Sequence, residues 1–312
     1  MARPALIAVG IGAALVAGAA VVVLAEGPQS AIPLAVDQPP PTTAAPAPVT
    51  PEPTPNEPAQ PAPTDIPPPV PGELISNGPR DIPKVAITFD TAFAADTAAL
   101  TNAGIFPPQY NEAVVNYLAA EKIPATVFVT GLWAEQYPQA MERMAGIDTF
   151  EFGNHTWSHA GWTDDCYGLP SPGDEVAQRF EIARSAKLIA QYADSWPTYI
   201  RFPGLCQDPG DVALAGEYGE YTVGTDLTIF DTGVTDASFA VEGILAEVQP
   251  GSIILLHLNG APNTPATLEI LTQLVPALRE RGLTPVTVSE LLAPVDQEPA
   301  PADPTAEPAE VG

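Results

Sequence analysis

Two histidines stand four residues apart in the segment Gly153-Asn154-His155-Thr156-Trp157-Ser158-His159, and the whole chain of 312 residues has only three histidines. Imidazole nitrogens are common ligands of zinc and related divalent cations. A four-residue spacing lets both rings converge on one point from a helical turn or a tight loop. The segment therefore predicts a metal site with His155 and His159 as two of its ligands.

Three other polar residues stand where short apolar runs end. Asp90 closes the run Lys84–Asp90, Arg201 lies near the end of another run, and the third histidine, His257, closes a later one. A core histidine bonded to a backbone carbonyl is the simplest interpretation of any one of these histidines in isolation. That interpretation weakens when all three histidines fall at the ends of predicted strands, so we expect them to share a site with Asp90 and Arg201.

The elements that position these residues are short strands alternating with amphipathic helices. This alternation favours a parallel α/β barrel over an open sheet, and in either architecture the carboxyl ends of the strands surround the active site. We expect strands at 84–90, 125–130, 149–152, 199–203, 221–225, 252–257 and 283–288. We expect helices at 107–123, 134–145, 173–192, 208–218, 237–248 and 264–281, with a last turn at 289–292.

Composition divides the chain into four parts. Residues 1–27 contain an uncharged apolar run, which predicts either a signal peptide or an uncleaved membrane anchor. Residues 28–72 are rich in Pro, Ala and Thr and predict a disordered spacer, whereas 73–293 predict the globular domain. Residues 294–312 predict an acidic, proline-rich disordered tail. Both interpretations of the first segment place the domain outside the cytoplasm.

Net charge and cysteine content limit which binding partners and which cellular compartment are expected. The net charge of −27 argues against nucleic acid and anionic lipid, since both need basic patches, and favours a neutral or cationic polymer. Membrane contact is expected only through the N-terminal segment, and the domain is expected to be a monomer. In an oxidising compartment the only two cysteines, Cys166 and Cys206, predict a disulfide, with a free pair or a cysteine-bound metal as the alternatives.

Four segments together resemble the polysaccharide deacetylase family, also called the NodB-homology domain or carbohydrate esterase family four. They are Ile87-Thr88-Phe89-Asp90, the histidine segment 153–159, Arg201-Phe202-Pro203-Gly204 and Ile254-Leu255-Leu256-His257, in the order and with the spacing of the family's motifs. The resemblance covers residues 85–292. It implies a distorted (β/α)7 barrel of the NodB-homology type and metal-dependent hydrolysis of N-acetyl groups on amino sugars.

The resemblance also implies a role for each residue. His155 and His159 would hold a divalent metal, most simply Zn²⁺, and Asp90 would be the general base, kept ionised by Arg201. His257 would be the general acid that protonates the leaving amine, with its pKa raised by a nearby carboxylate. The family supplies that carboxylate from an Asp-Trp motif that is absent here, so Asp226 and Asp231 are both candidates.

The family's second aspartate, a metal ligand, is replaced here by Thr91. A neutral hydroxyl is a poor substitute for a carboxylate at a divalent cation. The position could be filled by Asp90 itself, by water, or by one of the acids Asp96, Asp164 and Asp165. Ala92-Phe93 stands where the family has Gly-Pro. The bulk of Phe93 is expected to reshape the mouth of the site.

Aromatic residues after the histidines are candidates for stacking on sugars. They are Trp157, Trp162 and Tyr167, and packing beneath the loop is the alternative for each. Cys166 and Cys206 would join the histidine loop to the arginine loop. The sequence thus predicts an exported deacetylase of an N-acetylated glycan such as peptidoglycan. The alternatives are a catalytically impaired glycan-binding module of the same fold and a hydrolase of another amide or ester.

Overall fold

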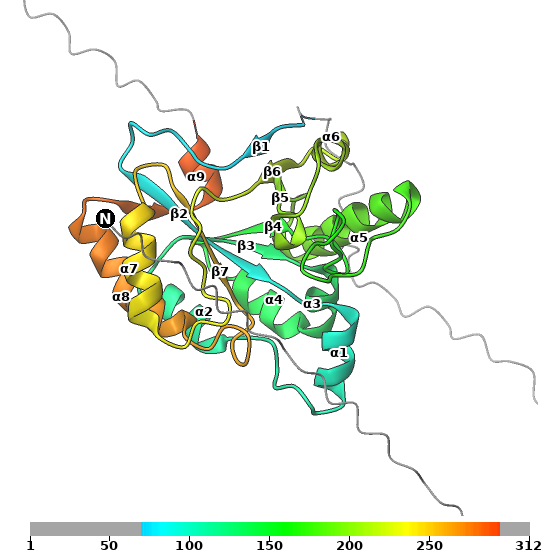
Figure 1. Cartoon of the computed structure of the whole chain (residues 1–312), viewed down its shortest axis with the longest axis horizontal. Coiled ribbons are helices and arrows are strands. Elements are labelled where there is room, and N and C mark those ends of the chain that lie inside the picture. Colours follow the sequence, from blue (N-terminus) through cyan, green and yellow to red (C-terminus); the bar gives the residue numbers. More distant parts are fainter. Residues whose placement is uncertain (1–69, 71, 294–312) are drawn as a thin grey trace, which may run out of the picture. The chain divides into compact units, whose positions relative to one another are not determined.

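The computed structural model describes residue 70 and residues 72–293, which are drawn as coloured ribbon in Figure 1. The segments predicted to be a signal or anchor (1–27) and a tail (294–312) lie outside the described residues, as does nearly all of the spacer predicted at 28–72. Within the described ranges, no helix is long and apolar enough to cross a membrane.

A parallel sheet of eight strands forms the centre of the molecule, in the order β1-β6-β5-β4-β3-β2-β7, with β8 pairing on β2. All seven ladders between named strands are parallel, as the alternation of strands and helices predicted. The strands are β1 (Leu74–Ile75), β2 (Lys84–Thr91), β3 (Ala125–Val129), β4 (Phe150–Asn154), β5 (Tyr199–Ile200), β6 (Tyr221–Val223), β7 (Ile253–His257) and β8 (Thr284–Val286).

The sheet curls into a half-closed barrel. β1 and β7 stand at the two ends of the strand order, and an isolated antiparallel bridge joins Asn77, which follows β1, to Ser252, which directly precedes β7. The predicted distorted barrel is therefore confirmed in this incompletely closed form. The sequence predicted seven of the eight strands and missed β1, whose two residues are too short to show a periodic pattern.

Helices cover the sheet and alternate with its strands along the chain (Figure 1). The segment 134–145, predicted as one helix, is two, because Pro138 has no N–H and disfavours a helical conformation at Tyr137, whose φ and ψ are −125° and 57°. α1 was not predicted. The helices are α1 (Ala95–Asn102), α2 (Glu112–Ala120), α3 (Gly131–Gln136), α4 (Pro138–Ala145), α5 (Glu175–Ala193), α6 (Pro209–Glu217), α7 (Ala237–Glu247), α8 (Thr267–Glu280) and α9 (Val288–Leu292), with a 3-10 turn at Pro203–Leu205.

The alternation of side chains along β2 divides the core into two parts. Val85, Ile87 and Phe89 pack in the large cluster formed with the covering helices, whereas Ala86 packs in a smaller cluster on the other face. Because side chains alternate with a period of two along a strand, Asp90 shares the face of Ala86, and Thr91 lies on the helix-covered face. Asp90 and Thr91, although adjacent in the sequence, therefore lie on opposite faces of the sheet.

Candidate active site

The carboxyl ends of β2, β4, β5 and β7 bring the predicted polar residues to one edge of the sheet. Asp90 lies at the end of β2, His155 directly follows β4, Arg201 directly follows β5 and His257 ends β7. β2 and β7 are neighbours, and Asp90 is in register with His257. Paired residues on neighbouring strands are about 5 Å apart and point to the same face. The strand order therefore juxtaposes an acidic and a basic side chain separated by most of the domain's sequence.

Asp90 is held by Arg201 in the interior. Nη1 of Arg201 donates to Oδ1 of Asp90 over 2.8 Å, and both residues are buried. Burial alone would raise the pKa of Asp90, but the charges of Arg201, His155 and His257 and the hydrogen bond from Arg201 outweigh it, so the pKa lies below its usual 3.8. Asp90 is therefore ionised at neutral pH, with Oδ1 occupied by Arg201.

Most of the hydrogen-bonding capacity of Arg201 is taken up by the protein. Besides Asp90, it donates to Oγ1 of Thr88 over 2.9 Å and to the carbonyl oxygens of Val223 and Gly224 over 3.2 and 3.0 Å. Its guanidinium carbon lies 4.1 Å from the centre of the Phe128 ring. These contacts use four of the five N–H donors of the buried guanidinium, so Arg201 is held in place to orient Asp90.

His155 and His159 lie with their ring centres 5.2 Å apart. Nδ1 of His155 is 2.7 Å from the carbonyl oxygen of Arg201. Because a carbonyl oxygen can only accept, that Nδ1 carries the proton and Nε2 keeps its lone pair. Nε2 lies 3.6 Å from Oδ2 of Asp90. Burial lowers the pKa of both histidines, for His159 to about 3, so both rings are neutral at pH 7 and can act as ligands.

Thr91, at the position expected to hold a third metal ligand, has its side chain turned away from the histidines. Oγ1 of Thr91 accepts the backbone N–H of Thr130 over 3.0 Å, and Oγ1 of Thr130 donates to the carbonyl oxygen of Thr91 over 2.9 Å. Among the described residues, no group of three or more His, Cys, Asp or Glu side chains could hold a metal ion. Of the ligands that the sequence predicts, the described residues therefore bring together only the two histidines.

The acids that we considered as replacements for the missing ligand lie elsewhere. Asp96 accepts the backbone N–H of Thr97 over 2.7 Å at the start of α1. Asp164 and Asp165 are exposed on the loop after the histidines. In the structure, none of these three alternative ligands bonds to His155 or His159.

His257 is paired with Asp231, which decides between the two candidate carboxylates. Nδ1 of His257 lies 2.7 Å from Oδ1 of Asp231, and the backbone N–H of His257 donates to Oδ2 over 3.0 Å. Burial alone would lower the pKa of His257, but the charge and hydrogen bond of Asp231 and the charge of Asp90 outweigh it and raise the pKa above 6.5. The other candidate, Asp226, instead pairs with Arg80 over 2.7 Å and accepts from Ser252, so it does not orient His257.

Sequence reasoning missed two residues that support these groups. Oγ1 of Thr267, at the start of α8, donates to Oδ2 of Asp231 over 2.6 Å. Glu220 is buried beneath the histidine segment, accepts from Nδ2 of Asn154 over 2.9 Å, and its burial raises its pKa well above 4.5. The position of an acid directly before a predicted strand is the signal that could have identified Glu220. Nothing in the sequence distinguishes Thr267 from other threonines at the start of a helix.

Of the three aromatic candidates, Tyr167 alone presents a ring to solvent, being 84% exposed, whereas Trp157 and Trp162 are each 7% exposed. Trp157 packs against Gly131, where even a Cβ atom would come within 2.0 Å of the ring, and Trp162 packs edge-on against Phe202. The two tryptophans thus correspond to the packing alternative. Phe93 is also buried, against Tyr137, so it does not add bulk at the mouth of the site as expected.

The predicted disulfide between Cys166 and Cys206 is present, with its Cα atoms 5.9 Å apart. It joins the loop that follows the histidines to the turn that follows Arg201. The ring of Tyr167 and both sulfur atoms would lie about 3 Å from a Cβ atom placed on Gly204, which adopts a positive φ of 64°. The disulfide therefore ties the exposed tyrosine and the two loops together beside the site.

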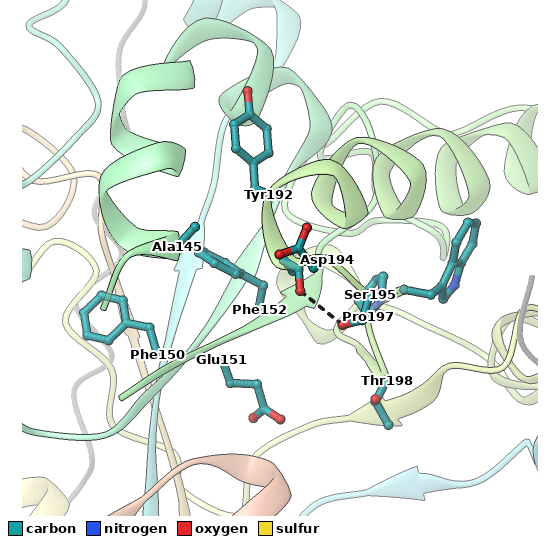
Figure 2. Close-up of a pocket in the computed structure, with 11 residues that line it drawn as sticks. Ala145, Phe150, Glu151, Phe152, Tyr192, Asp194, Ser195, Pro197 and Thr198 are labelled. Carbon is teal, nitrogen blue, oxygen red and sulfur yellow. Dashed lines mark hydrogen bonds between the residues drawn. The ribbon is translucent and has the colours of Figure 1, made fainter. Parts of the chain in front are cut away.

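A cavity of about 310 Å³ lies at the opposite edge of the sheet. It is lined by residues at the start of β4 and by the segment 192–198 that leads into β5. Figure 2 shows that Tyr192 and Phe150 extend away from one another around it, and its dashed line marks the bond from Ser195 to the carbonyl oxygen of Ala193. None of the predicted catalytic residues contributes to this cavity.

Part of the chain is similar in sequence to known carbohydrate deacetylases. Residues 77–223 match the family model of the polysaccharide deacetylases. A chitooligosaccharide deacetylase of Sinorhizobium fredii (strain NBRC 101917 / NGR234) is 29% identical over 185 residues, which are 56% of this chain and 82% of the relative. A peptidoglycan-N-acetylglucosamine deacetylase of Bacillus cereus is 24% identical over 215 residues, which are 69% of this chain and 70% of the relative.

Solved structures share the fold. A peptidoglycan N-acetylglucosamine deacetylase has a TM-score of 0.58 at 23% identity, covering 70% of this chain and 92% of the other. A family 4 acetyl xylan esterase from Clostridium thermocellum in complex with a cobalt ion has a TM-score of 0.51 at 28% identity, covering 66% and 89%. A family 4 carbohydrate esterase pseudoenzyme from Bacillus anthracis has a TM-score of 0.58 at 17% identity, covering 71% and 69%.

Proposed function

We propose that this chain, whose residues 77–223 belong to the polysaccharide deacetylase family, is a hydrolase that removes N-acetyl groups from an amino-sugar polymer of the cell envelope, such as peptidoglycan. Two curated relatives are named for chitooligosaccharide and for peptidoglycan N-acetylglucosamine, which share the acetamido sugar as the reacting unit. A neutral acetylated polymer also suits a chain of net charge −27 better than an anionic one does.

The observation that carries the proposal is the pairing of Asp90 with His257 in register on neighbouring strands, each with a buried partner of its own. Their surroundings push the two pKa values in opposite directions, downward for Asp90 and upward for His257. Two titratable groups whose pKa values are driven apart are the usual arrangement of a general base and a general acid. This gives the site one group to accept a proton and one to donate a proton at the same pH.

The chemistry assigned to the chain's own residues follows. Asp90, with Oδ2 free of hydrogen-bond donors in the described part of the chain, accepts the proton of the attacking water. His257 donates its proton to the nitrogen of the departing amine, and Asp231 stabilises the imidazolium before that transfer. A divalent cation, for which we propose Zn²⁺, would be held by His155 and His159 and would supply Lewis acidity to the acetyl group.

Export and tethering belong to the same proposal. The disulfide between Cys166 and Cys206 supports an oxidising compartment outside the cytoplasm. We assign residues 1–27 to the signal or anchor and 28–72 to a spacer that sets the reach of a monomeric domain, with membrane contact through the first segment alone.

A specific observation favours a second candidate, a glycan-binding module that has lost catalysis. Thr91 bonds to Thr130, and the described residues provide no third side chain for a cation. One solved relative is described as a pseudoenzyme of the same esterase family, although at 17% identity it supports only the fold. A third candidate, a hydrolase of an ester such as acetylated xylan, rests on the acetyl xylan esterase relative.

The deciding experiment measures acetate release by the full chain from N-acetylglucosamine oligomers, peptidoglycan and acetylated xylan. Each reaction is run after chelation and again with added Zn²⁺ or Co²⁺, with Asp90→Asn as the inactive control. Cation-dependent release from the first two substrates supports the proposal. Glycan binding without release from any substrate would support the binding module, and release from xylan alone would support the esterase.

A further inference from the structure

Glu181 on α5 is a buried carboxylate that binds the middle of the histidine segment. It is 7% exposed. Its Oε2 accepts the backbone N–H groups of Trp157 and Ser158 over 2.9 and 2.8 Å, and its Oε1 accepts the hydroxyl of Ser158 over 2.7 Å. None of the basic residues in the described part of the chain forms an ion pair with it. All of its recorded bonds therefore go to two residues that lie between His155 and His159.

The segment that Glu181 binds has an unusual backbone. Thr156 and His159 adopt positive φ angles of 63° and 58°, which residues with a Cβ atom rarely take up. Such conformations persist only where the surrounding structure imposes them. Here, the N–H groups of Gly131 and Leu132 at the start of α3 bond the carbonyl oxygens of Thr156 and Trp157, each over 3.0 Å. The segment is thus held by α3 through its carbonyl groups and by Glu181 through its N–H groups.

A second contact from α5 acts on the same segment. Arg184, three residues after Glu181, lies with its guanidinium carbon 3.5 Å from the centre of the Trp157 ring. Gly131 contacts the same ring, since a Cβ atom there would overlap it. α5 therefore fixes Trp157 at both its backbone and its side chain. Of these two contacts, the Glu181 carboxylate is the one that bonds directly to the backbone connecting the two histidines.

We propose that Glu181 is a positioning residue that sets the orientation of the His155 and His159 rings relative to one another, acting through Trp157 and Ser158. This inference rests on the proposed function, because it concerns the geometry with which the two histidines hold a cation. Residues that orient metal ligands typically change metal affinity or activity by about 10- to 100-fold when they are replaced. We expect the effect of Glu181 to fall in that range because it accepts hydrogen bonds from two consecutive backbone N–H groups between the histidines and a third from the Ser158 hydroxyl.

The test compares the full-length wild type with Glu181→Gln and with the matched control Glu175→Gln. Glu175 lies on the same helix, is exposed and pairs with Arg179. Glutamine keeps the size of Glu181 but replaces one carboxylate oxygen by an amide nitrogen, which cannot accept a hydrogen bond. The bonds made by that oxygen are therefore lost. We expect Glu181→Gln to weaken Co²⁺ binding, measured by calorimetry, at least tenfold and to alter the visible spectrum of bound Co²⁺. We expect kcat on N-acetylglucosamine oligomers to fall while KM stays within twofold, and Glu175→Gln to behave as wild type.

Wild-type Co²⁺ affinity and spectrum in Glu181→Gln would overturn the inference. If Glu181→Gln does not fold, Ser158→Ala serves as the second variant, because it removes one of the three hydrogen bonds. We expect it to reduce the affinity for Co²⁺ by a smaller factor, and an unchanged affinity would count against the inference. A wild type that binds no Co²⁺ would refute the proposed cation site instead. In that case, the NMR ¹H–¹³C signals of the His155 and His159 rings test the inference. A change of these signals in Glu181→Gln but not in Glu175→Gln supports it, and signals identical to those of the wild type in both variants refute it.

Discussion

Nδ1 of His257 lies 2.7 Å from Oδ1 of Asp231, and Oδ2 of the same carboxylate accepts the hydroxyl of Thr267 over 2.6 Å. The second bond fixes the carboxylate, so its charge stays beside the imidazole. A general acid must be protonated when it acts, and a raised pKa keeps His257 protonated to higher pH. In the proposed mechanism, this pair therefore determines how far activity extends toward alkaline pH.

Replacing Asp231 by asparagine should shift the alkaline limb of the kcat profile to lower pH. The protonated form of His257 exists below its pKa, so a variant that loses the raising charge loses protonated histidine at a lower pH. We expect a shift of about one pH unit or more, the size usually produced by an adjacent opposite charge. The measurement is kcat for acetate release between pH 5 and 10, values that bracket the ordinary histidine range.

Asp226→Asn is the matched control for that shift, since Asp226 bonds to Arg80 and Ser252 and not to His257. Its alkaline limb should coincide with that of the wild type. A profile of Asp231→Asn that also coincides with the wild type would show that Asp231 does not set the protonation of His257.

Replacing Thr91 by aspartate should strengthen cation binding. Thr91 is the last residue of β2 and bonds to Thr130, so the aspartate has to turn its carboxylate from that face toward His155 and His159; once there, the carboxylate binds a divalent cation far better than a hydroxyl does. We expect the dissociation constant for Zn²⁺ or Co²⁺ to fall at least about tenfold, by analogy with the effect of other residues around metal ligands. Thr91→Ser keeps the hydroxyl that bonds to Thr130 and should bind as the wild type does. Equal affinities in all three proteins would show that a carboxylate at this position does not contribute to the cation site.

Removing the disulfide should lower the free energy of unfolding. Cys166 and Cys206 are 40 residues apart in the sequence. A loop of this size is expected to contribute about 3–4 kcal/mol through the entropy of the unfolded chain. Urea denaturation of the Cys166→Ser, Cys206→Ser double variant measures the difference, and reduced wild type should match the variant. A variant as stable as the oxidised wild type would mean that the disulfide does not stabilise the fold.

Tyr167→Ala should raise KM for glycan oligomers with little change in kcat. The ring is 84% exposed beside the site and is free to stack on a sugar. A stacked pair contributes about 0.5–1.5 kcal/mol, which corresponds to roughly a two- to tenfold rise in KM. Tyr167→Phe keeps the ring and should retain the wild-type KM. If both variants have the wild-type KM, the tyrosine does not contact the substrate.

The clustering of the polar residues at the ends of apolar runs could be predicted from the sequence, because the direction of a strand determines at which edge of the sheet its last residue lies. In a parallel sheet all carboxyl ends share one edge, so Asp90, His155, Arg201 and His257 were expected together, and the structure brings them together. The α/β class and the curled sheet were predictable for the same reason. The two-residue strand β1 gave no periodic signal, and the division of the helix at Tyr137 depended on the local effect of Pro138.

What could not be predicted depends on the path of loops and on burial. Asp226 and Asp231 follow the same strand, and only the course of the chain between β6 and α7 decides which one reaches His257. Trp157 and Tyr167 belong to one loop, yet one ring is enclosed and the other is in solvent. Glu181 lies on a helix whose pattern merely suggests amphipathicity, and its three bonds to the histidine segment arise from tertiary packing.

The strand order has a consequence for how the chain acquires its activity. β2 lies between β3, which follows it closely, and β7, whose residue Ile253 pairs with Ala86. Contacts between such distant segments form slowly and late in folding. A nascent or truncated chain that ends before β7 would expose an unpaired edge of β2 next to Asp90 and would lack its acid partner entirely. The pair of Asp90 and His257 is therefore assembled only after β7 has been synthesised and has paired with β2.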